Sequence, residues 1–272
     1  MHGLRGNDKR RFKQNRGQGR FHEYVSWLLV QEVSSLGVEA RIPGVKVDRL
    51  YHLLSTLEQN VFYIVEWADE VVDIREQFPL LPLERTMDIA SDLGVKHPVK
   101  PNGDKVMTTD FVVTTKRDGG LHDVVISCKY AADLDKDAVL QRLEIERRFF
   151  EVSGMNWSIA TEHEIPQAQL ENIRWVRPFS WKLPNRVERG ELERLSVDLL
   201  ARITDAPLIP LARVCRDMDD SLGLGLGTSL ALARHLLATK RWRADFSQII
   251  DPSIHSLSGL VEQSQATESS HD

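Results

Sequence analysis

The chain has 272 residues, 42% of them hydrophobic and 28% charged, which is enough for one large domain or two ordinary ones with hydrophobic cores. No apolar run approaches the roughly 20 residues that span a bilayer, and the basic N-terminus has no apolar signal segment, so we expect a soluble cytoplasmic protein. Two cysteines, Cys128 and Cys215, are too few for a disulfide framework or a cysteine-rich zinc site, which favours reduced thiols.

Positive charge is concentrated at the N-terminus. The formal net charge is −5, yet residues 1–20 hold seven Lys or Arg against Asp8 alone, a net +6 that leaves −11 for the rest. This segment is poor in apolar side chains, so we expect a flexible basic arm over 1–20 that is disordered until it meets a polyanion such as DNA. A solubilising tail would explain the charge equally well.

Periodicity predicts an α/β domain over residues 21–175. Helices are expected at 21–36, 48–66 and 133–152, and strands at 71–78, 107–115, 123–130 and 156–161. The turn-forming sequence KRDGGLH joins the second and third strands, which predicts a hairpin.

A second domain is predicted after a stretch of prolines and tryptophans at 174–185. Helices are expected at 188–203, 208–220 and 228–238, with a short strand at 242–246. This order fits a winged-helix-like domain over 176–255, and a helical dimerisation or packing domain fits it equally well. The sequence GLGLG lacks the Lys and Ser/Thr of a phosphate-binding loop and predicts only a turn. Residues 256–272 are expected to form a flexible tail.

Four charged residues stand where the local pattern calls for apolar side chains. Glu58 and Glu146 each fall on the apolar face of a predicted helix. Asp110 lies in the strand sequence TTDFVV, and Lys129 ends the partner strand, with Ser127 two residues earlier on the same face. Taken singly, either glutamate is more often a salt-bridged boundary residue than a ligand, and a single Asp in a strand or a single Lys at a strand end is unremarkable.

Taken together, these residues favour phosphodiester cleavage. Acidic side chains supply the oxygen ligands that hard divalent cations prefer, and such an ion neutralises charge on phosphate and activates water. The lysine would orient or deprotonate the attacking water, a role that suits a buried amine with a lowered pKa.

Glu58, Asp110 and Lys129 in this order resemble the PD-(D/E)xK nuclease core, a restriction-endonuclease-like α/β fold with a mixed central sheet flanked by helices. More narrowly, LLSTLEQNVFYIVEW, DIREQFPLLP, TTDFVV and LEIERRFFEVSGMNWSIATEHEI resemble TnsA transposon endonucleases in order and spacing, over roughly residues 45–175. The resemblance implies that Glu58 and Asp110 are metal-binding catalytic carboxylates, that Lys129 is the catalytic lysine and that Glu146 is a further acidic position at the metal. The family usually has an acidic residue or Gln two positions before the lysine. Here Ser127 offers a metal only a shorter, neutral hydroxyl.

The resemblance also implies a function. Family members are Mg²⁺-dependent endonucleases, with Mn²⁺ as a substitute, that cut double-stranded DNA at the 5′ strands of transposon ends. A TnsB-like transposase cuts and joins the 3′ strands, a TnsC-like ATPase regulates both, and the polar C-terminal tail would fold on that ATPase. Two rivals stay open: a stand-alone restriction or repair nuclease with the same core, and a non-catalytic assembly subunit.

Overall fold

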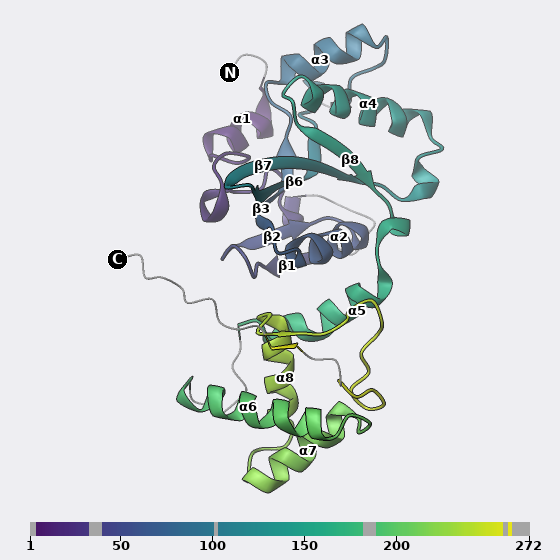
Figure 1. Cartoon of the computed structure of the whole chain (residues 1–272). Coiled ribbons are helices and arrows are strands. Elements are labelled where there is room, and N and C mark those ends of the chain that lie inside the picture. The colour runs from purple at the N-terminus through teal and green to yellow at the C-terminus, as the bar shows by residue number, and fades with distance from the viewer. Residues whose placement is uncertain (1–3, 33–39, 101–102, 182–188, 258–260, 263–272) are drawn as a thin grey trace. The chain divides into compact units, whose positions relative to one another are not determined.

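The computed structural model describes residues 4–32, 40–100, 103–181, 189–257 and 261–262 (Figure 1). The chain divides into two compact units, Met1–Ile165 and Pro166–Asp272. In the described part of the chain, no helix has the length and apolar character needed to cross a membrane.

A four-stranded sheet forms the centre of the first unit, in the order β3-β6-β7-β8. Its strands are β3 (Val71–Pro79), β6 (Thr108–Arg117), β7 (Gly120–Cys128) and β8 (Asn156–Ala160). Strand β6 is antiparallel to both β3 and β7, whereas β8 pairs in parallel with β7. The sheet is therefore mixed, and the restriction-endonuclease-like α/β expectation is confirmed.

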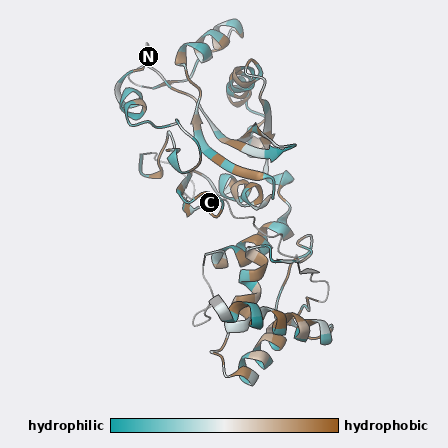
Figure 2. Cartoon of the chain, turned by 60° about the vertical axis from the view of Figure 1, so that its left-hand side comes forward, coloured by the Kyte–Doolittle hydropathy of each residue, from teal (hydrophilic) through white to brown (hydrophobic). Residues whose placement is uncertain are grey.

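Helices cover both faces of this sheet. They are α2 (Thr56–Trp67), α3 (Leu83–Asp92) and α4 (Asp137–Glu151). Figure 1 shows α3 and α4 on one face and α2 on the other. On the first face, buried residues of α3, α4 and the sheet form one core cluster, which includes Ala90, Val112, Val125, Ile145 and Phe150. Figure 2 shows hydrophobic residues along these strands.

The β6–β7 hairpin closes through the two-residue turn predicted by KRDGGLH. Arg117 pairs with Gly120, and Asp118 and Gly119 between them have φ of 50° and 76°. A two-residue hairpin turn with positive φ at both central positions matches the right-handed twist of its strands, and an Asp-Gly pair favours it. This turn fixes the register of both strands up to their far ends.

Several elements of the first unit differ from the prediction. The predicted helix 48–66 is a strand, β2 (Leu50–Leu53), followed by α2, because Ser55 caps a helix that begins only at Thr56. Strand β2 pairs with β1 (Ala40–Pro43), and β4 (Val99–Lys100) pairs with β5 (Gly103–Asp104). These strands, like α3, were not predicted. Short 3-10 helices occur at Phe21–Glu23, Val30–Glu32, Ala131–Asp133 and Glu162–Glu164.

The N-terminal segment is the largest departure. Residues expected in a flexible arm form α1 (Gly6–Lys13), and Phe12 of this helix, with Leu4 just before it, packs against a core cluster that contains the fully buried Trp27. The predicted helix 21–36 is replaced by extended chain and 3-10 turns as far as residue 32, and its remainder lies outside the described residues. The apolar spacing at Tyr24 and Trp27 reflects burial against the sheet and α1 rather than a helix face.

The second unit is helical. It contains α5 (Gln167–Val176), a 3-10 turn (Arg177–Phe179), α6 (Arg189–Asp205), α7 (Leu211–Leu222) and α8 (Thr228–Ala238). Leu199, Met218 and Leu236, one each from α6, α7 and α8, are fully buried. The three helices expected beyond residue 188 are present, while the winged-helix likeness stays a prediction.

The edges of the second unit also differ from expectation. The division falls between Ile165 and Pro166, ten residues before the predicted boundary, since Asn172 of α5 hydrogen-bonds Gln248 and Ile250 (2.7 and 2.8 Å). The predicted strand 242–246 is only β9 (Trp242–Arg243), paired with β10 (Val261–Glu262). Leu257 is buried and β10 is paired, so this part of the predicted tail is ordered; residues 258–260 and 263–272 lie outside the described residues.

Candidate active site

The far ends of β6 and β7 bring Asp110 and Lys129 together. Asp110 and Ser127 lie one residue beyond the Phe111–Ile126 pair on these strands. Asp110 Oδ2 accepts hydrogen bonds from the backbone N–H of Cys128 (2.6 Å) and from Lys129 Nζ (3.1 Å). Lys129 Nζ also donates to the carbonyl oxygen of Cys128 (2.6 Å). The carboxylate and the ammonium are thus held as an ion pair at the sheet end.

Glu58 reaches the site from the first turn of α2. Ser55 Oγ accepts from the N–H of Glu58 (3.1 Å) and donates to its carboxylate (3.0 Å), an arrangement that caps the helix. The carboxylate also accepts from the backbone N–H of Leu54 (2.9 Å) and from Gln77 Nε2 (3.1 Å). Glu58 is 7% exposed, and all these donors are uncharged.

Glu146 reaches the same region from α4, as predicted from its place on the apolar face. One carboxylate oxygen accepts from Ser127 Oγ (3.3 Å) and the other from Trp157 Nε1 (3.0 Å). The residue is 4% exposed, and Val139, Leu143 and Phe150 of the same helix are buried with it. The structure therefore joins the predicted residues as two pairs, Asp110 with Lys129 and Ser127 with Glu146.

The carboxyl groups of Glu58, Asp110 and Glu146 all interact with the positive charge of Lys129. Burial first, and then the charge of Asp110, raise the pKa of Glu58 to about 8, because hydrogen bonds and Lys129 only partly oppose them. Burial likewise raises the pKa of Glu146 to about 7, with Asp110 again adding to the effect. Glu58 and Glu146 thus hold their protons more tightly than usual, mainly because burial disfavours their charged forms and in addition because the Asp110 carboxylate lies near.

Lys129 departs from one expectation. Burial alone would lower its pKa, but Asp110 and Glu146 outweigh burial, so the pKa of the ammonium lies above its ordinary value. Without metal, the pKa of this amine is therefore raised rather than lowered, and its role as a base toward water stays a prediction. A charged Lys129 can orient a water or a phosphate oxygen and offset its charge.

The donor set fits a hard divalent cation, although the side chains do not yet converge on one. Among the described residues, no three His, Cys, Asp or Glu groups lie close enough to hold a metal ion as they stand. Carboxylate oxygens are the ligands that Mg²⁺ prefers, and a bound dication would favour the ionised forms of Glu58 and Glu146, which burial and Asp110 disfavour.

Two side chains at the site were not predicted. Gln77 is 2% exposed, donates to Glu58, and has a φ of 49°, a left-handed conformation that is uncommon for this residue. Trp157 donates to Glu146 from β8. A feature of the sequence that could have identified Gln77 is an amide side chain within a strand whose other residues are almost all buried. Trp157 is half-buried in β8, and its position in the sequence gave no comparable indication.

Comparison with known proteins decides the family. The sequence matches a model described as TnsA-like endonuclease N terminal over residues 68–162, and one described as TnsA endonuclease C terminal over residues 164–246. It is 42% identical over 236 residues to Transposon Tn7 transposition protein TnsA of Escherichia coli, covering 84% of this chain and 82% of that protein. The chain belongs to the TnsA endonuclease family. The family predicted from the sequence is thereby confirmed.

The two matched regions meet beside the division between Ile165 and Pro166, so the family's two parts coincide with the two compact units. Asp110, Lys129 and Glu146 lie within the N-terminal match, whereas Glu58 precedes it.

Proposed function

We propose that this chain is the DNA endonuclease subunit of a heteromeric cut-and-paste transposase, which cleaves the 5′ strands at transposon ends by metal-dependent phosphodiester hydrolysis. One observation carries the proposal: Asp110, Lys129, Glu58 and Glu146 gather at one sheet end in a chain of the TnsA endonuclease family, with more carboxylates than cations to balance them.

Mg²⁺ is the metal we propose, with Mn²⁺ as a substitute, held by Asp110 together with Glu58 and Glu146. When bound, such an ion neutralises charge developing on the phosphate and makes water a stronger nucleophile. Lys129, anchored by Asp110 and the Cys128 carbonyl, presents a charged donor to a water or phosphate oxygen. The hydrogen bonds to Glu58 and Glu146 fix both carboxylates before DNA arrives, so little ordering is left to the reaction.

Ser127 has a positioning role in this proposal. Its hydroxyl donates to Glu146 and lies on the strand beside Asp110, where the family usually has an acidic residue or Gln. Glu146 from α4 then supplies the carboxylate that β7 lacks. Ser127 contributes orientation, and a direct bond from its oxygen to the metal is not needed.

The partners in this proposal are double-stranded transposon-end DNA, a TnsB-like transposase for the 3′ strands and a TnsC-like ATPase regulator. The curated relative is by its name a transposition protein of the transposon Tn7. The net charge of −5 supports the division of labour, because a nuclease that searches DNA alone benefits from a broad positive potential.

The test is an excision assay reconstituted with the transposase and the ATPase, in which cutting of the 5′ strands is measured with Mg²⁺ or with EDTA. Asp110→Ala should lower 5′ cutting by about a hundredfold or more, and EDTA should abolish it, while 3′ cutting continues in Asp110→Ala. Asp88→Ala, an exposed carboxylate on α3, is the matched control.

The same assay separates the rivals. Unchanged 5′ cutting by Asp110→Ala would leave a non-catalytic assembly subunit as the better account. Efficient cutting by this chain without its partners would favour a stand-alone restriction or repair nuclease.

A further inference from the structure

The exposed side of α1 carries an unusual concentration of positive charge. Arg5, Lys9 and Lys13 follow one another at intervals of four residues, so they share one side of the helix, and Arg10 lies next to them. All four side chains are exposed. Within the described residues, no ion pair includes Arg5, Lys9 or Lys13. The guanidinium of Arg10 comes no closer than 4.0 Å to the carboxylate of Glu32, which is a long ion pair.

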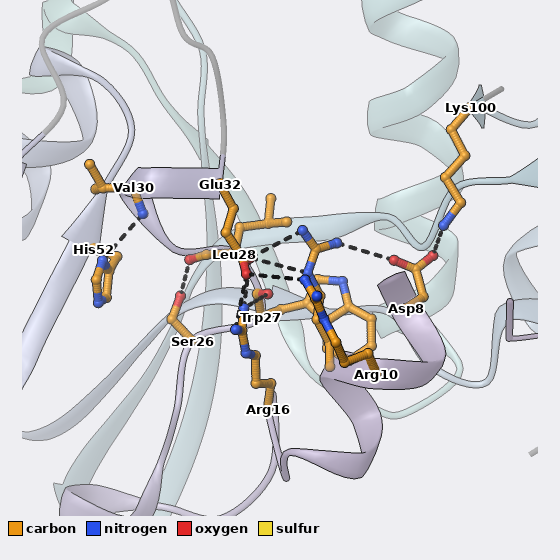
Figure 3. Close-up of polar contacts among 11 residues, drawn as sticks. Asp8, Arg10, Arg16, Ser26, Trp27, Leu28, Val30, Glu32, His52 and Lys100 are labelled. Atoms are coloured by element: carbon orange, nitrogen blue, oxygen red, sulfur yellow. Dashed lines mark hydrogen bonds and ion pairs between the residues drawn. The ribbon is translucent and has the colours of Figure 1, made fainter. Parts of the chain in front are cut away.

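The opposite side of α1 is fastened to the first unit by buried charge. Figure 3 shows Glu32 receiving hydrogen bonds from Arg16 (2.7 and 3.0 Å), and Asp8 paired with Lys100. Arg11 joins the two carboxylates, at 3.2 Å from each. Burial raises the pKa of Glu32, but Arg16 and Arg11 outweigh burial and lower it, so the anchor stays charged at neutral pH.

The basic residues of α1 and of the chain directly before and after it therefore fall into two groups. Arg11 and Arg16 serve as internal anchors with side chains 13% and 9% exposed. Arg5, Lys9 and Lys13 face solvent. Holding three unpaired cations on an ordered helix orients them toward a common partner, which a disordered arm cannot do.

The position of α1 relates this surface to the candidate active site. The chain leaves the sheet at Pro79, the last residue of β3, and re-enters it at Thr108, the first residue of β6. These two residues pair with each other, and Thr108 lies two residues before Asp110. The apolar side of α1 belongs to the same cluster as Leu83 and Val106, which lie in that connection. The anchored helix thus lies at the end of the sheet at which the site lies.

We propose that Arg5, Lys9 and Lys13 bind the phosphate backbone of the DNA that the active site cuts. The inference rests on the proposed function, because it takes DNA as the substrate. The chain outside residues 1–20 has a net charge of −11, which repels DNA, so the substrate needs a local source of attraction. Contacts of this kind position a duplex without reading its sequence.

The test compares two double variants of the full chain, Lys9→Ala/Lys13→Ala and Lys116→Ala/Arg117→Ala. Each removes two exposed positive charges, and the second pair lies at the end of β6 away from Asp110. Binding of a labelled 40-base-pair duplex is followed by fluorescence anisotropy in EDTA over a series of NaCl concentrations. The α1 variant should reduce the slope of log K against log [NaCl] by about 2, and the control should leave the slope unchanged.

A third variant tests whether the helix must be docked. Glu32→Ala removes a negative charge, so net charge alone predicts tighter binding to the duplex, whereas release of α1 from its anchor predicts weaker binding. Near-ultraviolet circular dichroism of the folded protein verifies the core of each variant.

Equal slopes for the α1 variant and the unaltered chain would overturn the proposal, as would tighter binding by Glu32→Ala or no binding of the duplex by the unaltered chain at low salt. Because EDTA prevents cleavage, the slope reports binding alone, whereas the excision assay with Asp110→Ala reports cutting. Loss of cutting and loss of the α1 contact are therefore distinguished.

Discussion

Glu58 and Glu146 are buried carboxyl groups that receive hydrogen bonds from uncharged donors, and this environment makes their ionisation costly. Glu58 also serves the fold, because it completes the cap of α2. The same side chain thus has a structural role in the free protein and, in the proposed function, a catalytic role with metal. A residue with both roles explains why the apolar face of α2 tolerates a carboxylate.

The first prediction concerns the pH dependence of stability without metal. The pKa of Glu58 is raised from 4.5 to about 8, so the folded protein binds more protons than the unfolded one across that interval. This stabilisation is complete below about pH 4.5 and is lost as the pH rises toward 8. We expect thermal melts in EDTA to show the corresponding fall in Tm.

Glu58→Gln should reduce the fall of Tm between about pH 4.5 and pH 8 and should raise the Tm at pH 8. The amide oxygen can still accept from Leu54 and Gln77, and the Ser55 hydroxyl can turn to accept from the amide NH₂. Glu84→Gln, an exposed position on α3, is the control and should keep the slope of the unaltered chain. A Glu58→Gln protein whose Tm still falls by the same amount would show that other groups cause the pH dependence.

At the scale of elements, the start of α2 determines where Glu58 points. Ser55 is the cap residue, and among the described side chains it alone is bonded both to the N–H and to the carboxylate of Glu58. The cap therefore stabilises the helix and orients a site residue at once.

The second prediction follows from this cap. Ser55→Ala should lower the free energy of unfolding by about 1 kcal/mol, which corresponds to roughly 2–4 °C in Tm, because one helical N–H loses its partner. It should also slow 5′ cutting, since Glu58 loses an orienting donor. Ser91→Ala, at an exposed position of α3, should change neither quantity. Equal melting of the two variants would contradict the capping role.

The same elements show what the sequence could and could not predict. Alternation placed Asp110 and Lys129 on paired strands, and the Asp118–Gly119 turn fixed their register, so this half of the site was predictable. The prediction of one helix over 48–66 was wrong because the apolar residues of Leu50–Leu53 fit the periodicity of a helix as well as that of a strand. The spacing of Ser55 and Glu58, a Ser-x-x-Glu capping signal, would have placed the start correctly.

Other features depend on contacts distant in sequence. Charge and composition predicted a flexible arm, but a single Glu32 pairs with Arg11 and Arg16 and makes that segment ordered. The raised pKa of Lys129 likewise depends on Asp110 and Glu146, which no local pattern places beside it. Gln77 joins the site only through the left-handed turn of its backbone.

At the scale of the whole molecule, α1 makes the N-terminus part of the first unit's core. The third prediction is that deletion of residues 1–20 lowers the free energy of unfolding by about 3 kcal/mol, because Leu4 and Phe12 no longer cover Trp27 and Glu32 loses its arginines. Chemical denaturation followed by tryptophan fluorescence measures the change. A flexible arm predicts instead that the deletion leaves the midpoint unchanged, and that result would exclude a structural role for α1.

The parallel pairing of β7 with β8 has an evolutionary consequence. Because α4 is the crossover between these strands, inserting one residue between Asp137 and Glu146 would rotate the glutamate by about 100° around the helix axis, away from Ser127. The Asp118–Gly119 turn constrains the site in a similar way, because a one-residue change in a two-residue turn would shift the register that places Asp110 beside Ser127. Gaps in alignments of relatives should therefore be absent both from that turn and from the first three turns of α4.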